Sequence, residues 1–319
     1  MADGIWTMGE MLVEIMRPEP GIELYEPGVF RGPFPSGAPA IFIDTVARLG
    51  HEAGIIGGVG DDDFGRCLLE RLGNDGVDCT CVGIFPGATA VAFVTYFRDG
   101  SRKFIFHIDG TPAVRATFDS EKIDRIPGFF HIMGCSLMAN DAFRSEIIGA
   151  AHYFHHHGAR ISFDPNIRAE LLGGRAVGEV IGPVMDVCSV IFPGEVELRL
   201  LTGRDDTGGM IDSMFRDYPG METIVLKRGG KGCSVYTRTF MADIPAIPVK
   251  EVDPTGAGDC FDAGFLCGML ENRPLVDCAK MAAAAGALNV MVFGPMEGDI
   301  NPERVERLIQ SFDDGKNGD

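Results

Sequence analysis

The sequence predicts an α/β fold with a central, mostly parallel sheet and helices on both of its faces. Between residues 129 and 227, short apolar runs of strand length alternate with helix-like segments, which is typical of βαβ units. Two β-rich stretches, at about 14–36 and 90–110, stand apart from this alternation. A glycine turn near residue 256 precedes a helix, and open α/β sheets bind ligands at strand ends of this kind. We expect a single domain spanning residues 1–319.

The composition of the 319-residue chain argues against several classes of function. A net charge of −18 disfavours nucleic acid and anionic membranes as partners, because both require a basic surface. Nine cysteines without a Cys-x-x-Cys pair indicate reduced thiols and not a disulfide framework or a zinc ribbon. The sequence has no apolar run of about 20 residues and no basic leader at Met1–Ile5, so we expect a cytoplasmic protein.

The stretch 253–264 is the most informative part of the chain. It has the pattern of a strand end, a small-residue turn and the first turn of a helix. Gly256, Ala257 and Gly258 leave room for a ligand beside the backbone, and the first amides of a helix lack intrahelical acceptors. We therefore expect a phosphate at this turn, with Asp259 taking a proton from an attacking hydroxyl. The alternative is an ordinary glycine turn in which Asp259 caps the helix.

The segment DPTGAGDCFDAGF, residues 253–265, closely resembles the C-terminal signature of the ribokinase-like (PfkB) carbohydrate kinases. In that family the Asp of Gly-Ala-Gly-Asp is the catalytic base and the turn before it forms an anion hole; these correspond to Asp259 and 256–258 here. Residues 55–65 and 76–78 resemble the family segments G-x-V-G-x-D-x-F-G and G-V-D. The resemblance covers nearly the whole chain, and no Walker A loop or protein-kinase HRD and DFG set is present.

The resemblance implies a ribokinase-like fold with ATP as phosphoryl donor and Mg²⁺ as its metal. It also implies a lid, a small sheet built from the stretches at about 14–36 and 90–110, through which the protein would form a homodimer. The implied acceptor is a small sugar or sugar acid, with 2-keto-3-deoxygluconate or fructose favoured. Two alternatives stay open: a nucleoside kinase of the same fold, and a sugar- or nucleotide-binding regulator without turnover.

The N-terminal segment provides the first substrate candidates. Residues 5–15 are predicted to form the first central strand, interrupted by a Gly-Glu pair at 9–10. In the resembled family such a pair faces the sugar, which makes Glu10 and Glu14 candidates; alternatively, Glu10 only ends the strand. The helix predicted over 36–50 resembles the family's GGxxxN segment and makes Gly37 a substrate candidate. Here Ser36 replaces the first glycine and Ile41 replaces the asparagine, so the resemblance does not name the sugar.

Two later segments are candidates for substrate binding. Residues 90–97 and 102–107 are predicted to form a hairpin with a turn at Asp99-Gly100, and we expect His107 of this hairpin to contact substrate. Residues 162–168 resemble the D-x-N-x-R segment of fructokinases and 2-keto-3-deoxygluconate kinases. That resemblance places Asn166 near the phosphates and Arg168 near the sugar or its carboxylate, which a guanidinium can bind with two hydrogen bonds. Alternatively, Arg168 is an exposed residue at a helix start.

The nucleotide and its metal are assigned to two further segments. Residues 192–197 fall where relatives carry N-x-x-E, so Glu197 is a candidate for Mg²⁺ through a bound water, although Gly194 replaces the Asn. The alternative is a solvated helix glutamate. Residues 226–232 resemble the family's nucleotide loop, which makes the following residues expected ATP contacts: Lys227, Gly229, Gly230, Lys231 and Gly232.

Three further predictions concern a bound cation, a small-residue helix and a group of histidines. The resemblance places a monovalent cation, K⁺, at Asp253, Thr255 and carbonyls near Phe293. The small-residue helix at 282–288 is a candidate surface under adenine, or only a tightly packed helix. The three histidines at 155–157 end a predicted helix, where their charge suits the helix dipole, so we favour a solvated helix end over a metal site.

Overall fold

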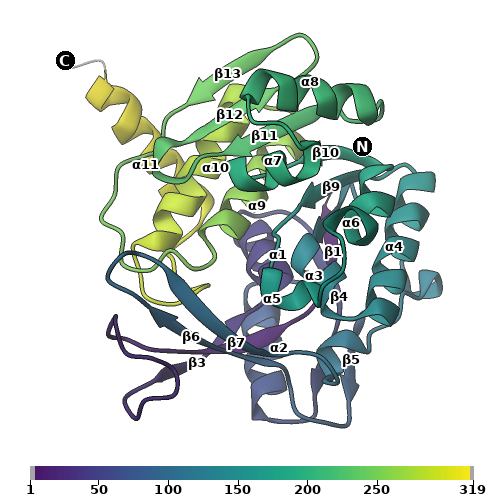
Figure 1. The fold of residues 1–319 in the computed structure, drawn as a ribbon, viewed down its shortest axis with the longest axis vertical. Helices are drawn as coiled ribbons and strands as arrows, with labels where there is room; N and C mark the ends of the chain where they lie inside the picture. The colour runs from purple at the N-terminus through teal and green to yellow at the C-terminus, as the bar shows by residue number, and fades with distance from the viewer. Residues whose placement is uncertain (1–3, 317–319) are drawn as a thin grey trace.

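Two sheets organise the protein (Figure 1). The computed structural model describes residues 4–316; residues 1–3, which entered the expectation about a leader, lie outside the described residues. Within 4–316, nine strands form a large sheet in the order β13-β12-β11-β10-β9-β8-β1-β4-β5, and four strands form a small sheet in the order β3-β2-β6-β7. The helices of this part of the chain are all too short or too polar to cross a membrane.

The large sheet is parallel from β11 to β5, as the alternation of apolar runs predicted. Strands β12 and β13 run antiparallel at one edge, and the sequence analysis did not predict them. The strands of this sheet are β1 Ile5–Met8, β4 Ala53–Gly60, β5 Val82–Phe85, β8 Phe129–Met133, β9 Arg160–Asp164, β10 Cys188–Ile191, β11 Thr223–Lys227, β12 Cys233–Tyr236 and β13 Met241–Ile244.

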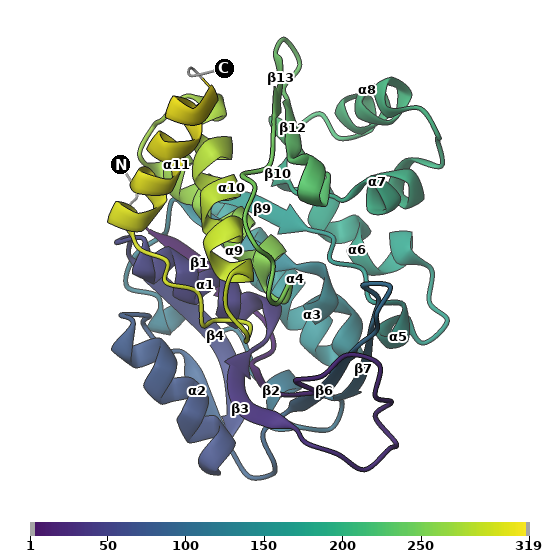
Figure 2. The same ribbon diagram turned by 90° about the vertical axis from the view of Figure 1, so that its left-hand side faces the viewer.

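Helices cover both faces of the large sheet, as Figure 2 shows. Successive strand side chains point to opposite faces, so Val190 and Ile191 enter two different buried apolar clusters. The first cluster includes helices α1 Ala38–Arg48, α2 Asp63–Asn74, α9 Ala257–Leu270, α10 Leu275–Val290 and α11 Pro302–Lys316. The second includes α3 Gly134–Ala139, α4 Asp141–His156, α6 Val177–Met185, α7 Glu195–Thr202 and α8 Thr207–Asp217.

The strand predicted over 5–15 is in fact two strands in different sheets. β1 ends at Met8, and after the crossing at Gly9 the chain enters β2, Leu12–Met16, in the small sheet. A Cβ at Gly9 would lie 2.3 Å from Pro39 Cγ and 2.5 Å from Ser136 Oγ. Only glycine fits this crossing, and the single-strand prediction was wrong because an apolar run does not reveal a change of sheet.

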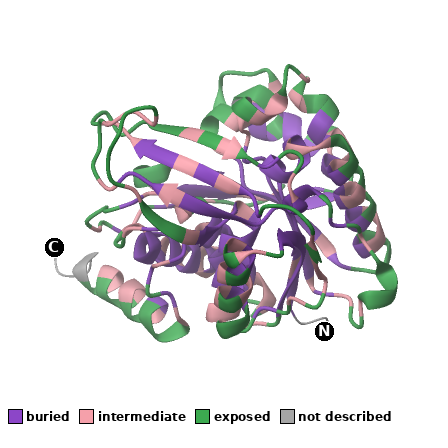
Figure 3. Ribbon diagram, turned by 90° about the horizontal axis from the view of Figure 1, so that it is seen from below, coloured by how far each residue is buried: buried purple, intermediate pink, exposed green. Residues whose placement is uncertain are grey.

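The small sheet, which we call the lid, confirms that the two distant β-rich stretches pair in space. Its strands are β2 with β3 Arg31–Ser36, β6 Val91–Tyr96 and β7 Arg102–His107. The antiparallel register places Tyr96 opposite Arg102 and Val94 opposite Phe104, so these side chains share one face. Figure 3 shows that this sheet contains buried residues flanked by exposed loops.

The small residues of α10 allow two helices to pack closely. A Cβ at Gly264 of α9 would lie 3.0 Å from Ala282 Cα, and one at Gly286 would lie 3.1 Å from the carbonyl oxygen of Ala257. Residues 282–288 are buried apart from a partly buried Ala283. Of the two interpretations of residues 282–288, this packing favours a tightly packed helix and not a surface for adenine. The same packing holds α9 in place after the glycine turn.

Candidate active site

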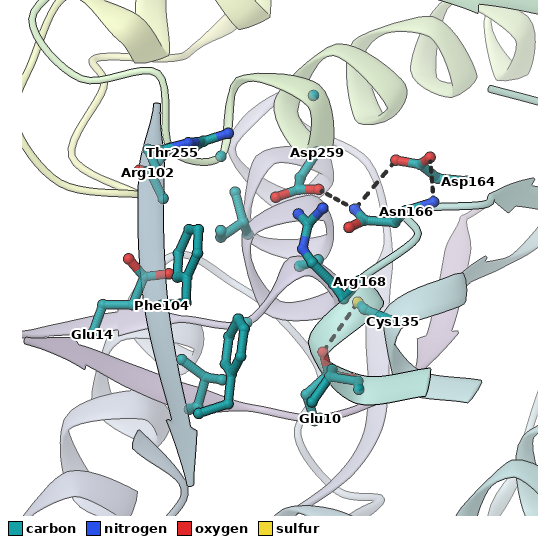
Figure 4. A pocket seen from close by; sticks show the side chains of 18 of the residues that line it. Glu10, Glu14, Arg102, Phe104, Cys135, Asp164, Asn166, Arg168, Thr255 and Asp259 are labelled. Carbon is teal, nitrogen blue, oxygen red and sulfur yellow. Dashed lines mark hydrogen bonds between the residues drawn. The ribbon is translucent and has the colours of Figure 1, made fainter. Parts of the chain in front are cut away.

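A cavity of ≈ 250 Å³ lies between the lid, the C-terminal ends of the large-sheet strands and the first turn of α9. Pockets for drug-sized ligands measure about 300–1,000 Å³, so this volume suits one small molecule, such as a single sugar. The cavity is lined by side chains from both sheets, and Figure 4 labels the principal ones. Lining residues that the sequence analysis named are Glu10, Glu14, Gly37, Asn166, Arg168, Glu197, Lys227, Thr255, Gly256, Gly258 and Asp259.

The turn before α9, residues 254–258, has the geometry expected of an anion site, and we call it the anion turn. Gly256 is the N-cap of α9 and has φ 80°, a left-handed conformation that favours glycine. A Cβ there would lie 2.5 Å from the carbonyl oxygen of Pro295 and 3.1 Å from Ile41 Cγ2. Because the first amides of α9 have no intrahelical acceptors, this end of the helix favours a negative ligand.

Asp259 lies in the first turn of α9, is 8% exposed and lines the cavity. Burial raises its pKa to about 7, and the nearby Asp164 carboxylate acts in the same direction, while Lys227 and Arg168 oppose them. Asn166 Nδ2 donates a hydrogen bond to Asp259 Oδ1 at 3.4 Å. A carboxyl group with a near-neutral pKa that faces a cavity is suited to accept a proton from a bound hydroxyl.

Asn166 joins Asp259 to a buried ion pair. Its backbone amide donates to Asp164 Oδ1 at 3.1 Å, and Lys227 Nζ contacts Asp164 Oδ2 at 2.7 Å. Lys227 also lies 3.3 Å from Asp262, and these carboxylates raise its pKa although burial opposes the charge. Lys227 thus balances the negative charge of Asp164 and Asp262. Its predicted contact with ATP stays a prediction. The buried Asn166 Oδ1 has no hydrogen-bond partner among the described residues and lies free for a ligand.

Two buried glutamates near the start of the chain, Glu10 and Glu14, line the cavity. Glu10 accepts hydrogen bonds from Ser136 Oγ and, at 3.2 Å, from Cys135 Sγ. Glu14 accepts one from Ser36 Oγ at 2.7 Å, which explains what the serine does where relatives have glycine. Burial raises the pKa of Glu14 to about 7, and its buried Oε2 has no hydrogen-bond partner within residues 4–316. Glu14 is thus prepared to bind a ligand hydroxyl.

Two arginines reach the cavity from opposite walls. Arg168 extends toward Asp259, and Arg102, from lid strand β7, lies beside Thr255 (Figure 4). Neither guanidinium forms a salt bridge with a carboxylate in the described part of the chain. The sequence analysis did not select Arg102, although counting alternate residues along β7 places Arg102, Phe104 and Phe106 on one face.

His107 does not line this cavity, so its assignment as a substrate contact needs correction. It alternates with Phe106 and Ile108, which do line the cavity, and therefore points to the outer face of the lid. There it is exposed, and its ring lies 6.2 Å from that of Phe93. Gly37, by contrast, lines the cavity as the N-cap of α1, with φ 103°.

Glu197 lines the cavity, but its carboxylate already holds the backbone. It accepts hydrogen bonds from the amides of Gly194 at 2.7 Å and Ile167 at 2.8 Å, and burial raises its pKa. Among residues 4–316, no three His, Cys, Asp or Glu side chains are grouped closely enough to form a metal site. Mg²⁺ is usually held by one or two carboxylates, waters and substrate phosphates, so Glu197 fits a water-mediated contact.

The predicted nucleotide loop lies outside the cavity. Gly229, Gly230 and Lys231 form an exposed 3₁₀ turn that follows β11 and Lys227. Gly232, with φ 92°, is needed for packing, since a Cβ there would lie 2.0 Å from the carbonyl oxygen of Ile244. The role of this loop in ATP binding stays a prediction.

Asp253 and Thr255 lie side by side under the lid. Asp253, 1% exposed, accepts hydrogen bonds from the amides of Thr255 at 3.0 Å and Gly294 at 2.9 Å. Tyr96 of β6 donates to Asp253 Oδ1 at 2.7 Å and lies 2.8 Å from Thr255 Oγ1. A buried carboxylate that forms no ion pair within residues 4–316 suits a nearby monovalent cation.

The histidines at 155–157 are exposed at the end of α4. His156 Nδ1 lies 2.7 Å from the carbonyl oxygen of His152, and His157 Nδ1 lies 2.7 Å from that of Tyr153. The helix ends here with its histidines exposed, as predicted, while the preference for a solvated helix end over a metal site stays a prediction.

The chain is similar in sequence and in fold to known carbohydrate kinases. A sequence model of the pfkB family carbohydrate kinases matches residues 33–302. Fructokinase-1 from Zea mays is 33% identical over 316 residues, covering 95% of this chain and 97% of the relative. An E. coli protein provisionally called ribokinase II, solved with ATP and Mg²⁺, has a TM-score of 0.90 and 37% identity, covering 96% of this chain and 99% of that one. A Vibrio cholerae fructokinase double mutant, solved with fructose, ADP and a potassium ion, has a TM-score of 0.82 and 26% identity, covering 97% and 99%.

Proposed function

Because the chain belongs to the pfkB family of carbohydrate kinases, we propose that it transfers the terminal phosphoryl group of ATP to a hydroxyl of a small sugar or sugar acid. The observation that carries this proposal is the position of Asp259. This carboxyl group faces the cavity beside the anion turn, and burial raises its pKa to about 7. The chain keeps both the aspartate and the glycine turn of the family signature, Asp259 and Gly256, which favours an enzyme over a regulator without turnover.

In the proposed mechanism, the lid and the strand ends hold the acceptor while Asp259 accepts the proton of the attacking hydroxyl. The amides of the anion turn, Gly256, Ala257 and Gly258, stabilise the negative charge that develops on the transferred group. Asn166 holds Asp259 in place, and its free Oδ1 together with Glu197 fits water-mediated contacts to Mg²⁺. When bound, Mg²⁺ would neutralise charge on the phosphates.

We propose fructose as the first candidate acceptor, since fructokinase relatives align with nearly the whole chain at 33% identity. A sugar acid such as 2-keto-3-deoxygluconate is the second candidate, and one observation favours it. Arg168 and Arg102 both reach the cavity without a carboxylate partner in the described residues, and guanidinium groups bind carboxylates with two parallel hydrogen bonds.

A coupled assay of ADP release tests these candidates. The panel should contain fructose, 2-keto-3-deoxygluconate, ribose, tagatose, adenosine and inosine, with Asp259→Asn as the blank. Fastest turnover with fructose or the sugar acid supports the proposal. Preference for a nucleoside would instead support the nucleoside-kinase alternative, and no turnover with any sugar contradicts the proposal.

A monovalent cation is part of the proposal. Asp253, Thr255 and the backbone near Phe293 suit K⁺, because the buried carboxylate forms no ion pair among the described residues. K⁺ would order the anion turn, so rates in K⁺ should exceed those in a bulky organic cation. Equal rates would argue against this site.

We also propose a homodimer formed through the outer face of the lid. Ile105 on this face is 43% exposed and is flanked by Lys103 and His107, which are also exposed. Sedimentation analysis of Ile105→Glu beside the unmodified protein tests the interface, and an unchanged mass would contradict it. The cytoplasmic location expected from the sequence stays a prediction.

A further inference from the structure

Tyr96 connects the lid directly to the buried carboxylate behind the anion turn. It is the last residue of β6, and its hydroxyl donates to Asp253 Oδ1 at 2.7 Å. The same hydroxyl lies 2.8 Å from Thr255 Oγ1, which can donate to it. Tyr96 does not line the cavity, whereas its partner across the strand pair, Arg102, does. The tyrosine therefore touches the support of the anion turn and not the ligand space.

A second lid strand reaches the same carboxylate by another route. The ring of Phe34 on β3 packs edge-on against Phe293, with 5.8 Å between ring centroids, and the Arg31 guanidinium lies 5.5 Å from the Phe293 ring centroid. The next residue, Gly294, donates its amide to Asp253 Oδ2 at 2.9 Å. One oxygen of Asp253 thus accepts a hydrogen bond from a lid residue, and the other accepts one from a segment that packs against the lid.

Asp253 in turn holds the anion turn. Its Oδ1 accepts the amide of Thr255 at 3.0 Å, and the carbonyl oxygen of Thr255 accepts a hydrogen bond from Asn289 Nδ2 at 2.7 Å. The close approach of Gly256 to Pro295 leaves no room for a side chain at that position. A buried carboxylate that loses a hydrogen-bond donor costs free energy, because the lost bond is not replaced by water. Displacement of the lid would therefore disturb Asp253 and, with it, the turn that presents the α9 amides.

We propose that Tyr96 is a positioning residue that couples the lid to the anion turn. With the lid in the position seen here, its hydroxyl completes the hydrogen bonds of Asp253 and orders the turn. With the lid displaced, that bond is absent and the turn is less ordered. This inference rests on the proposed function, because it concerns the lid and the anion turn of the same site.

The kinetic test is Tyr96→Phe, which removes only the hydroxyl. A hydrogen bond to a charged group contributes about 1.5–3 kcal/mol, so we expect kcat with the best acceptor of the panel to fall about tenfold or more. The KM for ATP should change less than about twofold, because Tyr96 belongs to lid strand β6 and not to the predicted nucleotide loop. The matched control is Tyr236→Phe on β12, at the far end of the large sheet, which should leave kcat unchanged. A kcat within twofold of the unmodified enzyme would overturn the proposal.

Hydrogen exchange tests the coupling without turnover. In Tyr96→Phe, with Mg²⁺ and ADP present, amides of residues 255–260 should exchange about tenfold faster, while those of β6 and β7 keep their protection. Faster exchange confined to the lid would show a role in lid stability only and would overturn the coupling. Because this readout needs no acceptor, it separates failure of this inference from failure of the proposed function.

A double-mutant cycle tests whether the two lid routes meet at Asp253. Phe34→Leu loosens the packing on Phe293, and Tyr96→Phe removes the direct hydrogen bond. If both act through Asp253, the double variant should lose less than the product of the two single losses in kcat. Fully multiplicative losses would contradict a shared route.

Discussion

The two walls of the cavity differ in how firmly their side chains are held. We define the floor as Asp164, Asn166, Lys227 and Asp259, which lie at the C-terminal ends of β9 and β11 and in the first turn of α9. Hydrogen bonds and an ion pair join these residues. On the lid wall, by contrast, strand β7 contributes side chains that are only partly buried or exposed, among them Arg102. A fixed floor suits the chemical step, which depends on geometry, and a less constrained wall suits the choice of acceptor. Four predictions test this division.

The largest effect is expected at the floor. Asp259→Asn keeps the shape of the side chain but removes the proton acceptor, and loss of a general base costs about 10²–10⁴-fold in rate. We expect kcat to fall within this range, while circular dichroism and ATP binding stay close to those of the unmodified protein. If the variant keeps more than about a tenth of the original kcat, Asp259 is not the base.

The next effect concerns recognition of an anionic acceptor. Lysine cannot form the two parallel hydrogen bonds of arginine, so Arg168→Lys should lower kcat/KM for a sugar acid about 10–100-fold. For fructose the change should be small. Arg102→Lys on the lid is the matched variant, and it should repeat this pattern if both guanidinium groups bind one carboxylate. Equal losses for fructose and the sugar acid would contradict the clamp.

The pH dependence of kcat distinguishes the roles of two carboxyl groups, Asp259 and Glu14, that have similar pKa values. Burial raises the pKa of Asp259 on the floor to about 7 and that of Glu14 on the lid to about 7. A base works only when deprotonated, so kcat should fall about tenfold for each pH unit below 7. Glu14→Gln should keep this acid limb and change only the KM for the sugar. If the limb disappears from kcat in that variant, Glu14 is the group that titrates.

The smallest effect is expected outside both walls, in the exposed loop after β11. Gly230→Val places a branched side chain in the predicted nucleotide loop and should raise the KM for ATP about tenfold, with less than about a twofold change in the sugar KM. Gly220→Val, in another exposed turn, is the control. The reverse pattern of KM changes would reject nucleotide binding at this loop.

Much of the floor was predicted from the sequence, and part of the lid was not. The anion turn, Asp259 and Asn166 lie in short motifs whose residues act within a few positions of one another, so local pattern was sufficient. The lid hairpin was also predicted, but the prediction that His107 points into the cavity was wrong. Arg102, on the other face of the same strand, lines the cavity instead. A strand with apolar residues on both faces does not show which face is inward, and a one-residue shift reverses every side chain.

The sequence alone determined the features that depend on local backbone chemistry. The turn before α9 needs a left-handed φ at position 256, which glycine adopts readily. The alternation of apolar runs is enough to predict parallel βαβ units. Only the tertiary structure decided the near-neutral pKa of Asp259, the ion pair of Lys227 and the bond from Tyr96 to Asp253. These depend on loss of solvent and on contacts between residues more than 60 positions apart, which no local pattern contains.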